Sequence, residues 1–110
     1  MILRKPIRKK DFHDCEHNNF GVFMVKLVVD LQREILAYDA EWHADLEAEL
    51  LTDNSMQNNL WGFNYYPDTD MLEYNSLINI RPMENRSADI LDPEICTQIE
   101  RIFRIWVQDE

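Results

Sequence analysis

The chain has little of what several protein classes require. Its 110 residues include two cysteines, and Cys15 and Cys96 match no metal-binding or redox spacing. No apolar run approaches the ~20 residues of a membrane span, and the start MILRKPIRKK holds no apolar stretch suited to export. We therefore expect reduced thiols, no zinc site and a cytoplasmic protein without a membrane partner.

Basic residues are also scarce. The chain has 11 Lys and Arg against 21 Asp and Glu, which gives a formal net charge of −10. Five of the basic residues lie near the start and predict a basic N-terminal arm over residues 1–8, whereas none lies between Arg33 and Arg81. Nucleic-acid binding needs clustered Lys and Arg, so we expect no nucleic-acid partner. The acids of the base-free stretch are expected to form a solvated acidic surface.

What is present suits a folded protein. The composition is 45% hydrophobic and 11% aromatic, with aromatic residues spread along the chain. A chain of this length buries roughly two-thirds of its unfolded surface when it folds. Because no repeat or linker interrupts it, we expect a single domain over residues 1–110.

The residue pattern predicts seven elements in the order α-β-β-α-β-β-α. Helices are expected at 9–18, 43–53 and from Asp92 onward, and strands at 22–30, 35–40, 60–66 and 72–81. Residues 43–53 also fit a strand, but Leu46 and Leu50 stand one turn apart and favour a helix that ends near Asn54. This order predicts an α+β domain with a four-stranded antiparallel sheet and helices on one face.

The last two strands are expected to form a hairpin around the turn Pro67–Asp70. If Asn64 faces Asn75, one face carries Trp61, Phe63, Tyr65, Tyr74, Ile78 and Ile80. The other face is then polar and carries Gly62, Asn64, Asn75, Leu77, Asn79 and Arg81. Gly62 is expected to let a ligand or another backbone approach closely.

The final helix has the clearest signature. Asp92 is a good N-cap residue, and Pro93 suits the first helical position. An apolar stripe follows at helical spacing, formed by Ile95, Ile99, Ile102, Phe103 and Trp106. We expect Phe103 and Trp106 to lie on the apolar face of the sheet.

Several short runs are distinctive, among them EWHADLE at 41–47, LWG at 60–62, SLINIRP at 76–82, NRS at 85–87 and DPEI at 92–95. Together they resemble a family of small prokaryotic proteins known only as a domain of unknown function. The resemblance covers most of the chain from Phe20 onward and implies no activity. Asp39 and Ala40 stand where that family often has a pair of glycines.

Glu41, His43 and Asp45 form the first candidate site. An imidazole beside a carboxylate can act as a general base or a metal ligand, because the carboxylate orients the ring and raises its basicity. The spacing lacks the second histidine of a zinc site, so no metal or cofactor is expected. Alternatively, His43 and Asp45 cap the helix start. Asp68, Asp70 and Glu73 lack most features of a calcium loop and are expected to form a hairpin turn.

A second candidate site is polar and basic, and combines Asn64, Asn75, Asn79, Arg81, Asn85 and Arg86. Amides and guanidinium groups bind carboxylate or phosphate well. Alternatively, the two arginines pair with the acid-rich helix. In that case Arg81 is expected to contact a carboxylate of Glu41, Asp45 or Glu49.

These observations favour a binding or protein-interaction module that contacts a protein or a small anionic ligand. The alternative is a small hydrolase or nuclease that uses His43 with the neighbouring carboxylates. A homodimer formed by pairing of edge strands is a third, weaker hypothesis.

Overall fold

The computed structural model describes residues 1–14 and 23–109. Its strands are β1 (Ile7–Arg8), β2 (Val25–Asp30), β3 (Ile35–Tyr38), β4 (Leu60–Tyr66), β5 (Met71–Glu73) and β6 (Val107–Gln108). Its α-helices are α1 (His43–Thr52) and α2 (Pro93–Trp106), and short 3-10 helices lie at Lys9–Asp14, Gln57–Asn59 and Leu77–Asn79. An antiparallel sheet in the order β3-β2-β4-β5 forms the centre, which confirms the predicted α+β class and four-stranded sheet.

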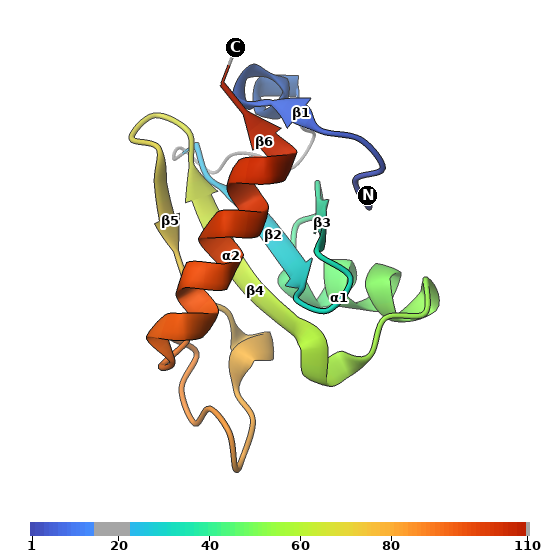
Figure 1. The fold of residues 1–110 in the computed structure, drawn as a ribbon, viewed down its shortest axis with the longest axis vertical. Coiled ribbons are helices and arrows are strands. Elements are labelled where there is room, and N and C mark those ends of the chain that lie inside the picture. The colour runs from blue at the N-terminus through green and yellow to red at the C-terminus, as the bar shows by residue number, and fades with distance from the viewer. Residues whose placement is uncertain (15–22, 110) are drawn as a thin grey trace.

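The two α-helices lie on opposite faces of this sheet (Figure 1). Phe103 of α2 packs with Leu27 on one face, whereas Leu46 of α1 packs with Val28 on the other. The prediction that the helices share one face is therefore wrong. The reason is the run at the centre of β2, where consecutive apolar residues point to both sides and each side needs a cover.

Helix α2 forms as its sequence predicts. Asp92 Oδ1 accepts a hydrogen bond from the Glu94 amide at 2.9 Å, so the N-cap is in place. Phe103 is fully buried, with its ring centroid 4.6 Å from that of Tyr65. Trp106 packs against the same core and donates from Nε1 to the Glu34 carbonyl at 2.7 Å. The predicted placement of Phe103 and Trp106 is confirmed.

Helix α1 is also confirmed, and the alternative of a strand over residues 43–53 is wrong. Residues in the left-handed conformation stand on both sides of it. Asp39, with φ of 70°, turns the chain out of β3, and Asn54, with φ of 76°, follows the helix end. The predicted helix at 9–18 appears as the 3-10 helix Lys9–Asp14, and the rest of that prediction lies outside the described residues.

The hairpin forms with a different register and a shorter second strand. Asn64 lies opposite Glu73 instead of Asn75, and β5 ends at Glu73 instead of continuing to residue 81. A two-residue shift keeps each side chain on its expected face, so the aromatic face still forms. It also gives a four-residue turn, closed by Asp70 with φ of 57°. Ile78 and Ile80 are not on that face: Ile78 packs on the α1 side, and Ile80 is exposed.

The side chain of Asn79 takes the place of a strand beside Gly62. Its Oδ1 accepts from the Gly62 amide at 2.8 Å, and its Nδ2 donates to the Gly62 carbonyl at 2.9 Å. The segment leading to Asn79 passes so close that a Cβ on Gly62 would lie 2.6 Å from the Cβ of Ser76. The expected close approach at Gly62 is thus made by the chain itself.

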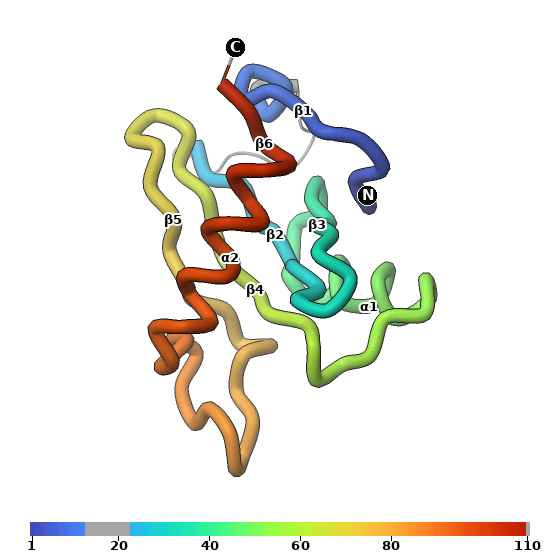
Figure 2. Tube along the Cα trace, in the orientation of Figure 1, coloured from blue at the N-terminus to red at the C-terminus, as the bar shows by residue number. Residues whose placement is uncertain are grey.

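One outer edge of the sheet is covered along its strand, and the other is covered beyond the end of its strand. The N-terminal residues run along β3, where Leu3 donates to the Leu36 carbonyl at 2.8 Å. On the other edge, Ile90 donates to the Tyr74 carbonyl at 3.0 Å, just beyond β5. Strands β1 and β6 pair side by side near the chain ends (Figure 2). A homodimer formed by pairing along β3 would therefore have to displace the N-terminal residues.

Among the residues that the structure describes, neither helix is long and apolar enough to cross a membrane.

Candidate functional site

A row of three polar residues crosses the sheet on the face that carries α1. Lys26 of β2 lies directly opposite Asn64 of β4, which in turn lies opposite Glu73 of β5. The next residues toward the sheet centre on this face, Val28 and Gly62, lie opposite each other. The cluster around Val28 is covered by Leu46 and Leu50 of α1. The polar row lies next to this cluster, at the level where α1 begins.

A cavity of about 280 Å³ lies between the polar row and the start of α1, and is lined by Lys26, Trp42, His43, Ala44, Asn64, Asn75, Ser76, Leu77 and Ile78. The sheet contributes its charged and amide groups. The exposed side chains of Trp42 and Leu77 contribute apolar surface. This combination of apolar walls and a few convergent polar groups is typical of small-ligand sites.

His43 anchors the helix start to the sheet. Its side chain is buried, and Nε2 lies 2.9 Å from the Phe63 carbonyl oxygen. Burial lowers the pKa of His43, an effect that the bond to Phe63 opposes and the charge of Lys26 reinforces. The ring is therefore neutral at pH 7, and its Nε2–H donates to Phe63.

Lys26 brings a positive charge to the cavity. It is partly buried on a central strand, and it forms no ion pair with any of the described residues, although the chain carries a net charge of −10. An unpaired ammonium at such a position attracts an anion.

The start of α1 adds to this potential. Trp42 occupies the N-cap position, and no described side chain caps the helix there. The first N–H groups of a helix have no partner within it, and the helix dipole makes this end positive. Trp42, His43 and Ala44 all line the cavity. The positive helix end and Lys26 therefore border the same space.

Asn64 has an acceptor without a partner. The side chain is only 6% exposed, and its Nδ2 donates to Glu73 Oε1 at 2.8 Å and to the Asn75 carbonyl at 3.4 Å. Its Oδ1 is buried and has no donor at hydrogen-bond geometry in the described part of the chain, although the Asn64 side chain lies close enough to the His43 ring to raise the pKa of His43. A buried polar atom left in this way costs about 1–3 kcal/mol, which a ligand carrying an N–H or O–H group would recover.

The structure does not assemble the predicted constellation of Glu41, His43 and Asp45. The two acids are exposed, whereas His43 is buried toward the sheet. The charged groups that influence the pKa of His43 are Lys26 and Glu73. Within residues 1–14 and 23–109, no group of three or more His, Cys, Asp or Glu side chains is placed to hold a metal ion.

The predicted polar and basic cluster divides into two groups. Asn64 and Asn75 line the cavity. Asn79 and Asn85 are buried and bind the backbone instead: Asn85 Nδ2 donates to the carbonyls of Asn79, Ser87 and Asp89, and its Oδ1 accepts from Leu91. These two amides fix the loop that follows the 3-10 helix. Arg86 is exposed and donates to the Pro82 carbonyl at 2.9 Å.

The sequence did not indicate the contacts that Arg81 makes. It is 7% exposed, donates to the backbone carbonyls of Asn58 and Leu60, and stacks 3.8 Å from the centroid of the Trp61 ring. The carboxylate within ion-pair distance is that of Glu84, at 4.0 Å. The predicted contact with Glu41, Asp45 or Glu49 is therefore wrong. Backbone carbonyls bind the two terminal nitrogens of the guanidinium because the segment 57–60 passes beside it, whereas the buried Nε has no hydrogen-bond partner among the described residues.

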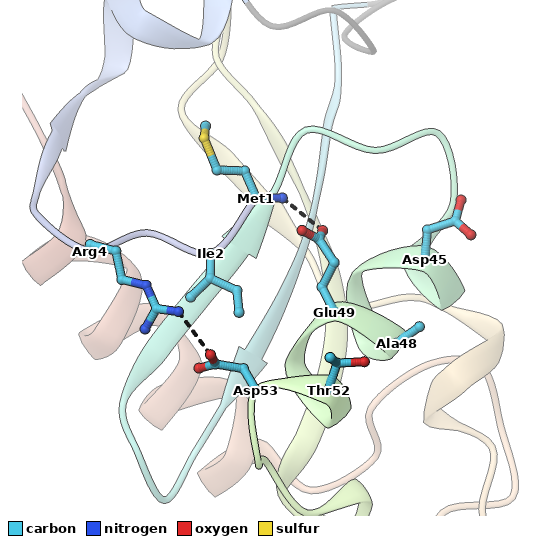
Figure 3. A pocket seen from close by; sticks show the side chains of 8 residues that line it. All are labelled: Met1, Ile2, Arg4, Asp45, Ala48, Glu49, Thr52 and Asp53. Carbon is cyan, nitrogen blue, oxygen red and sulfur yellow. Dashed lines mark hydrogen bonds and ion pairs between the residues drawn. The ribbon is translucent and has the colours of Figure 1, made fainter.

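A second hollow, of about 710 Å³, lies between the N-terminal residues and α1 (Figure 3). Its two cations are already paired. The Met1 ammonium contacts Glu49 at 2.7 Å, and Arg4 contacts Asp53 at 3.0 Å. Because each cation on its surface already has a carboxylate, this hollow offers an anion less than the cavity at Lys26 does.

The acidic turn between β4 and β5 is also bound within the chain. Asp70 pairs with Lys9 at 2.9 Å and with Arg104 at 2.7 Å, and it accepts a hydrogen bond from the Tyr65 hydroxyl. The hydrogen bond from Lys9 is the largest cause that holds the pKa of Asp70 far below its usual value. The predicted hairpin turn is confirmed, and Asp70 ties it to both chain ends.

Sequence reasoning missed Lys26 and Trp42 as site residues. Lys26 is the single charged residue inside the otherwise apolar run VFMVKLVV, and a charge within a buried strand is itself a signal. Trp42 precedes a helix with no capping side chain, and it leaves a large apolar ring 61% exposed. The sequence alone does not bring the two together.

The family comparison matches residues 1–105 to a model described as "Protein of unknown function (DUF5674)", and the chain belongs to this family. The resemblance to a family of unknown function is thereby confirmed. No curated protein and no solved structure matches the chain.

Proposed function

We propose that this protein is a binding module for a small anionic ligand, which it holds in the cavity between α1 and the polar row. The observation that carries the proposal is the partly buried Lys26, which has no ion-pair partner among the described residues, beside a start of α1 that none of their side chains caps. The anionic group, a carboxylate, accepts hydrogen bonds from the Lys26 ammonium and from the first amides of the helix.

Binding is favoured here over catalysis. The buried His43 uses its Nε2–H to hold the backbone of β4, and the exposed acids at 41 and 45 do not share its environment. In this tautomer Nδ1 carries the lone pair, but the carboxylates with which the hydrolase hypothesis pairs the ring are not among the groups that act on its pKa. The arrangement supports a site that recognises charge and shape.

Titration with phenylacetate, followed by calorimetry, tests the proposal, with benzyl alcohol as the uncharged analogue. We expect phenylacetate to bind and benzyl alcohol to bind on the order of tenfold more weakly, because a charge-assisted hydrogen bond is lost. Added salt is expected to weaken phenylacetate binding.

The variant Lys26→Gln removes the cation, and Lys10→Gln is its matched control, because Lys10 is exposed and does not line the cavity. We expect the Lys26 variant to lose on the order of tenfold in affinity and the Lys10 variant to bind as the unaltered protein does. Equal affinities for the two variants, or no phenylacetate binding at all, would overturn the proposal.

A further inference from the structure

The row Lys26, Asn64 and Glu73 has a polarity: a cation at one end, a carboxylate at the other and an amide between them. The register places the three residues opposite one another on adjacent strands, which stand roughly 5 Å apart. Glu73 Oε1 accepts from Asn64 at 2.8 Å and from the Tyr66 hydroxyl at 3.0 Å. Its Oε2 accepts no hydrogen bond from the described residues. Glu73 is exposed and does not itself line the cavity, but it stands next to Asn64 at the far end of the row. The row therefore offers a cation inside the cavity and a negative charge beside it.

We infer that the ligand is a free α-amino acid with an apolar side chain, bound as its zwitterion. This inference rests on the proposed anion site. The α-carboxylate binds at Lys26 and the start of α1, and the α-ammonium donates to Asn64 Oδ1 and faces the carboxylate of Glu73. An ammonium group supplies the donor that the buried Oδ1 lacks.

The charges argue against more highly charged anions. The cavity has one ammonium from a side chain, because His43 is kept neutral by burial, and Glu73 lies at the far end of the row. A phosphate dianion would meet a single cation and a nearby carboxylate, whereas a zwitterion matches both charges.

The apolar lining accounts for the side chain of the ligand. Trp42 is 61% exposed and Leu77 is 80% exposed, and both border the cavity together with Ile78. An aromatic or branched side chain would cover this surface, and an aromatic one would pair with the indole ring. The volume of about 280 Å³ is at the small end for ligand sites and suits one amino acid better than a peptide.

Four probes separate the contributions: L-phenylalanine, phenylacetate, phenethylamine and glycine. Phenylacetate lacks the ammonium together with the carbon that carries it, phenethylamine lacks the carboxylate, and glycine lacks the side chain. We expect L-phenylalanine to bind more tightly than each of the other three, by about tenfold over phenylacetate, because its ammonium adds a charge-assisted hydrogen bond.

The variant Glu73→Gln tests the ammonium subsite directly. We expect it to weaken L-phenylalanine severalfold while phenylacetate binds at least as well as before, because a nearby negative charge has been removed. Glu94→Gln is the matched control, since Glu94 is an equally exposed acid but lies at the start of α2, outside the row and without a bond to Asn64. It is expected to leave both affinities unchanged.

The outcomes separate the two proposals. If phenylacetate binds through Lys26 but L-phenylalanine binds no better, the anion site stands and the amino-acid inference is overturned. The inference also fails if Glu73→Gln weakens both probes equally. If phenethylamine binds as tightly as L-phenylalanine, or if no probe that carries a carboxylate binds, both proposals are overturned.

Discussion

The variant Asn79→Ala is expected to lower the free energy of unfolding by about 3–4 kcal/mol. Asn79 is fully buried, and its side chain makes three hydrogen bonds, to the Gly62 amide, the Gly62 carbonyl and the Ala88 carbonyl. Each buried backbone group left without a partner costs about 1–3 kcal/mol. Three such groups, partly relieved by relaxation and water, give the stated loss.

Urea unfolding followed by tryptophan fluorescence measures this loss. The matched control is Asn58→Ala, which makes the same substitution at an exposed residue whose backbone carbonyl, and not its side chain, binds Arg81. We expect the control to change stability by less than about 0.5 kcal/mol. A loss for Asn79→Ala no larger than that of the control would refute the claim that this amide replaces a strand beside Gly62.

The variant Asn79→Asp adds a pH test of the same contact. The introduced carboxyl still accepts from the Gly62 amide but, when ionised, cannot donate to the two carbonyls. Burial raises the pKa of such a group, so its neutral form is favoured in the folded state. The variant is therefore expected to be least stable at neutral pH and to approach the unaltered protein in stability as the pH falls toward about 4.

Three further outcomes are expected. Arg81→Lys keeps the charge but loses the planar guanidinium, which donates to several backbone carbonyls. Urea unfolding should therefore show a free energy of unfolding lower by about 2 kcal/mol, and unchanged stability would contradict this role. Gly62→Ala places a Cβ 2.6 Å from that of Ser76 and should lower the free energy of unfolding by about 2 kcal/mol. The double variant with Ser76→Gly should recover part of this stability. No recovery would exclude the clash as the cause. The pKa of Asp70 is lowered chiefly by Lys9, so its ion pairs contribute about 1 kcal/mol to stability above pH 3.8, and this contribution is lost as the pH falls below that value. The stability difference between the unaltered protein and Asp70→Asn should therefore shrink in acid. A constant difference would contradict the pairing.

Local signals in the sequence predicted those elements that carry their own caps and periodicity. Helix α2 is the clearest case, because Asp92, Pro93 and an apolar stripe act within one segment. The antiparallel sheet was predicted because strand patterns follow one another with short turns between them. The placement of α1 on the second face did not, although Val28 between two apolar neighbours in β2 contained the information.

The partners of Arg81 could not be read from the sequence, for a physical reason. Charge patterning suggests carboxylates as partners, but backbone carbonyls carry no sequence signature and depend on how the segment 57–60 is placed. The same holds for Asn79, whose amide imitates a strand. The cavity at Lys26 depends on two strands, the segment 75–78 and a helix start, which meet only in the folded chain.

The central claim, an anion held between Lys26 and the start of α1, is tested most directly by amide chemical shifts. In a ¹H–¹⁵N titration with phenylacetate, we predict the largest shifts at the amides of His43 and Ala44, and their loss in Lys26→Gln but not in Lys10→Gln. Shifts confined to other surfaces, such as the hollow beside Glu49, or shifts at His43 and Ala44 that persist unchanged in Lys26→Gln, would contradict the account.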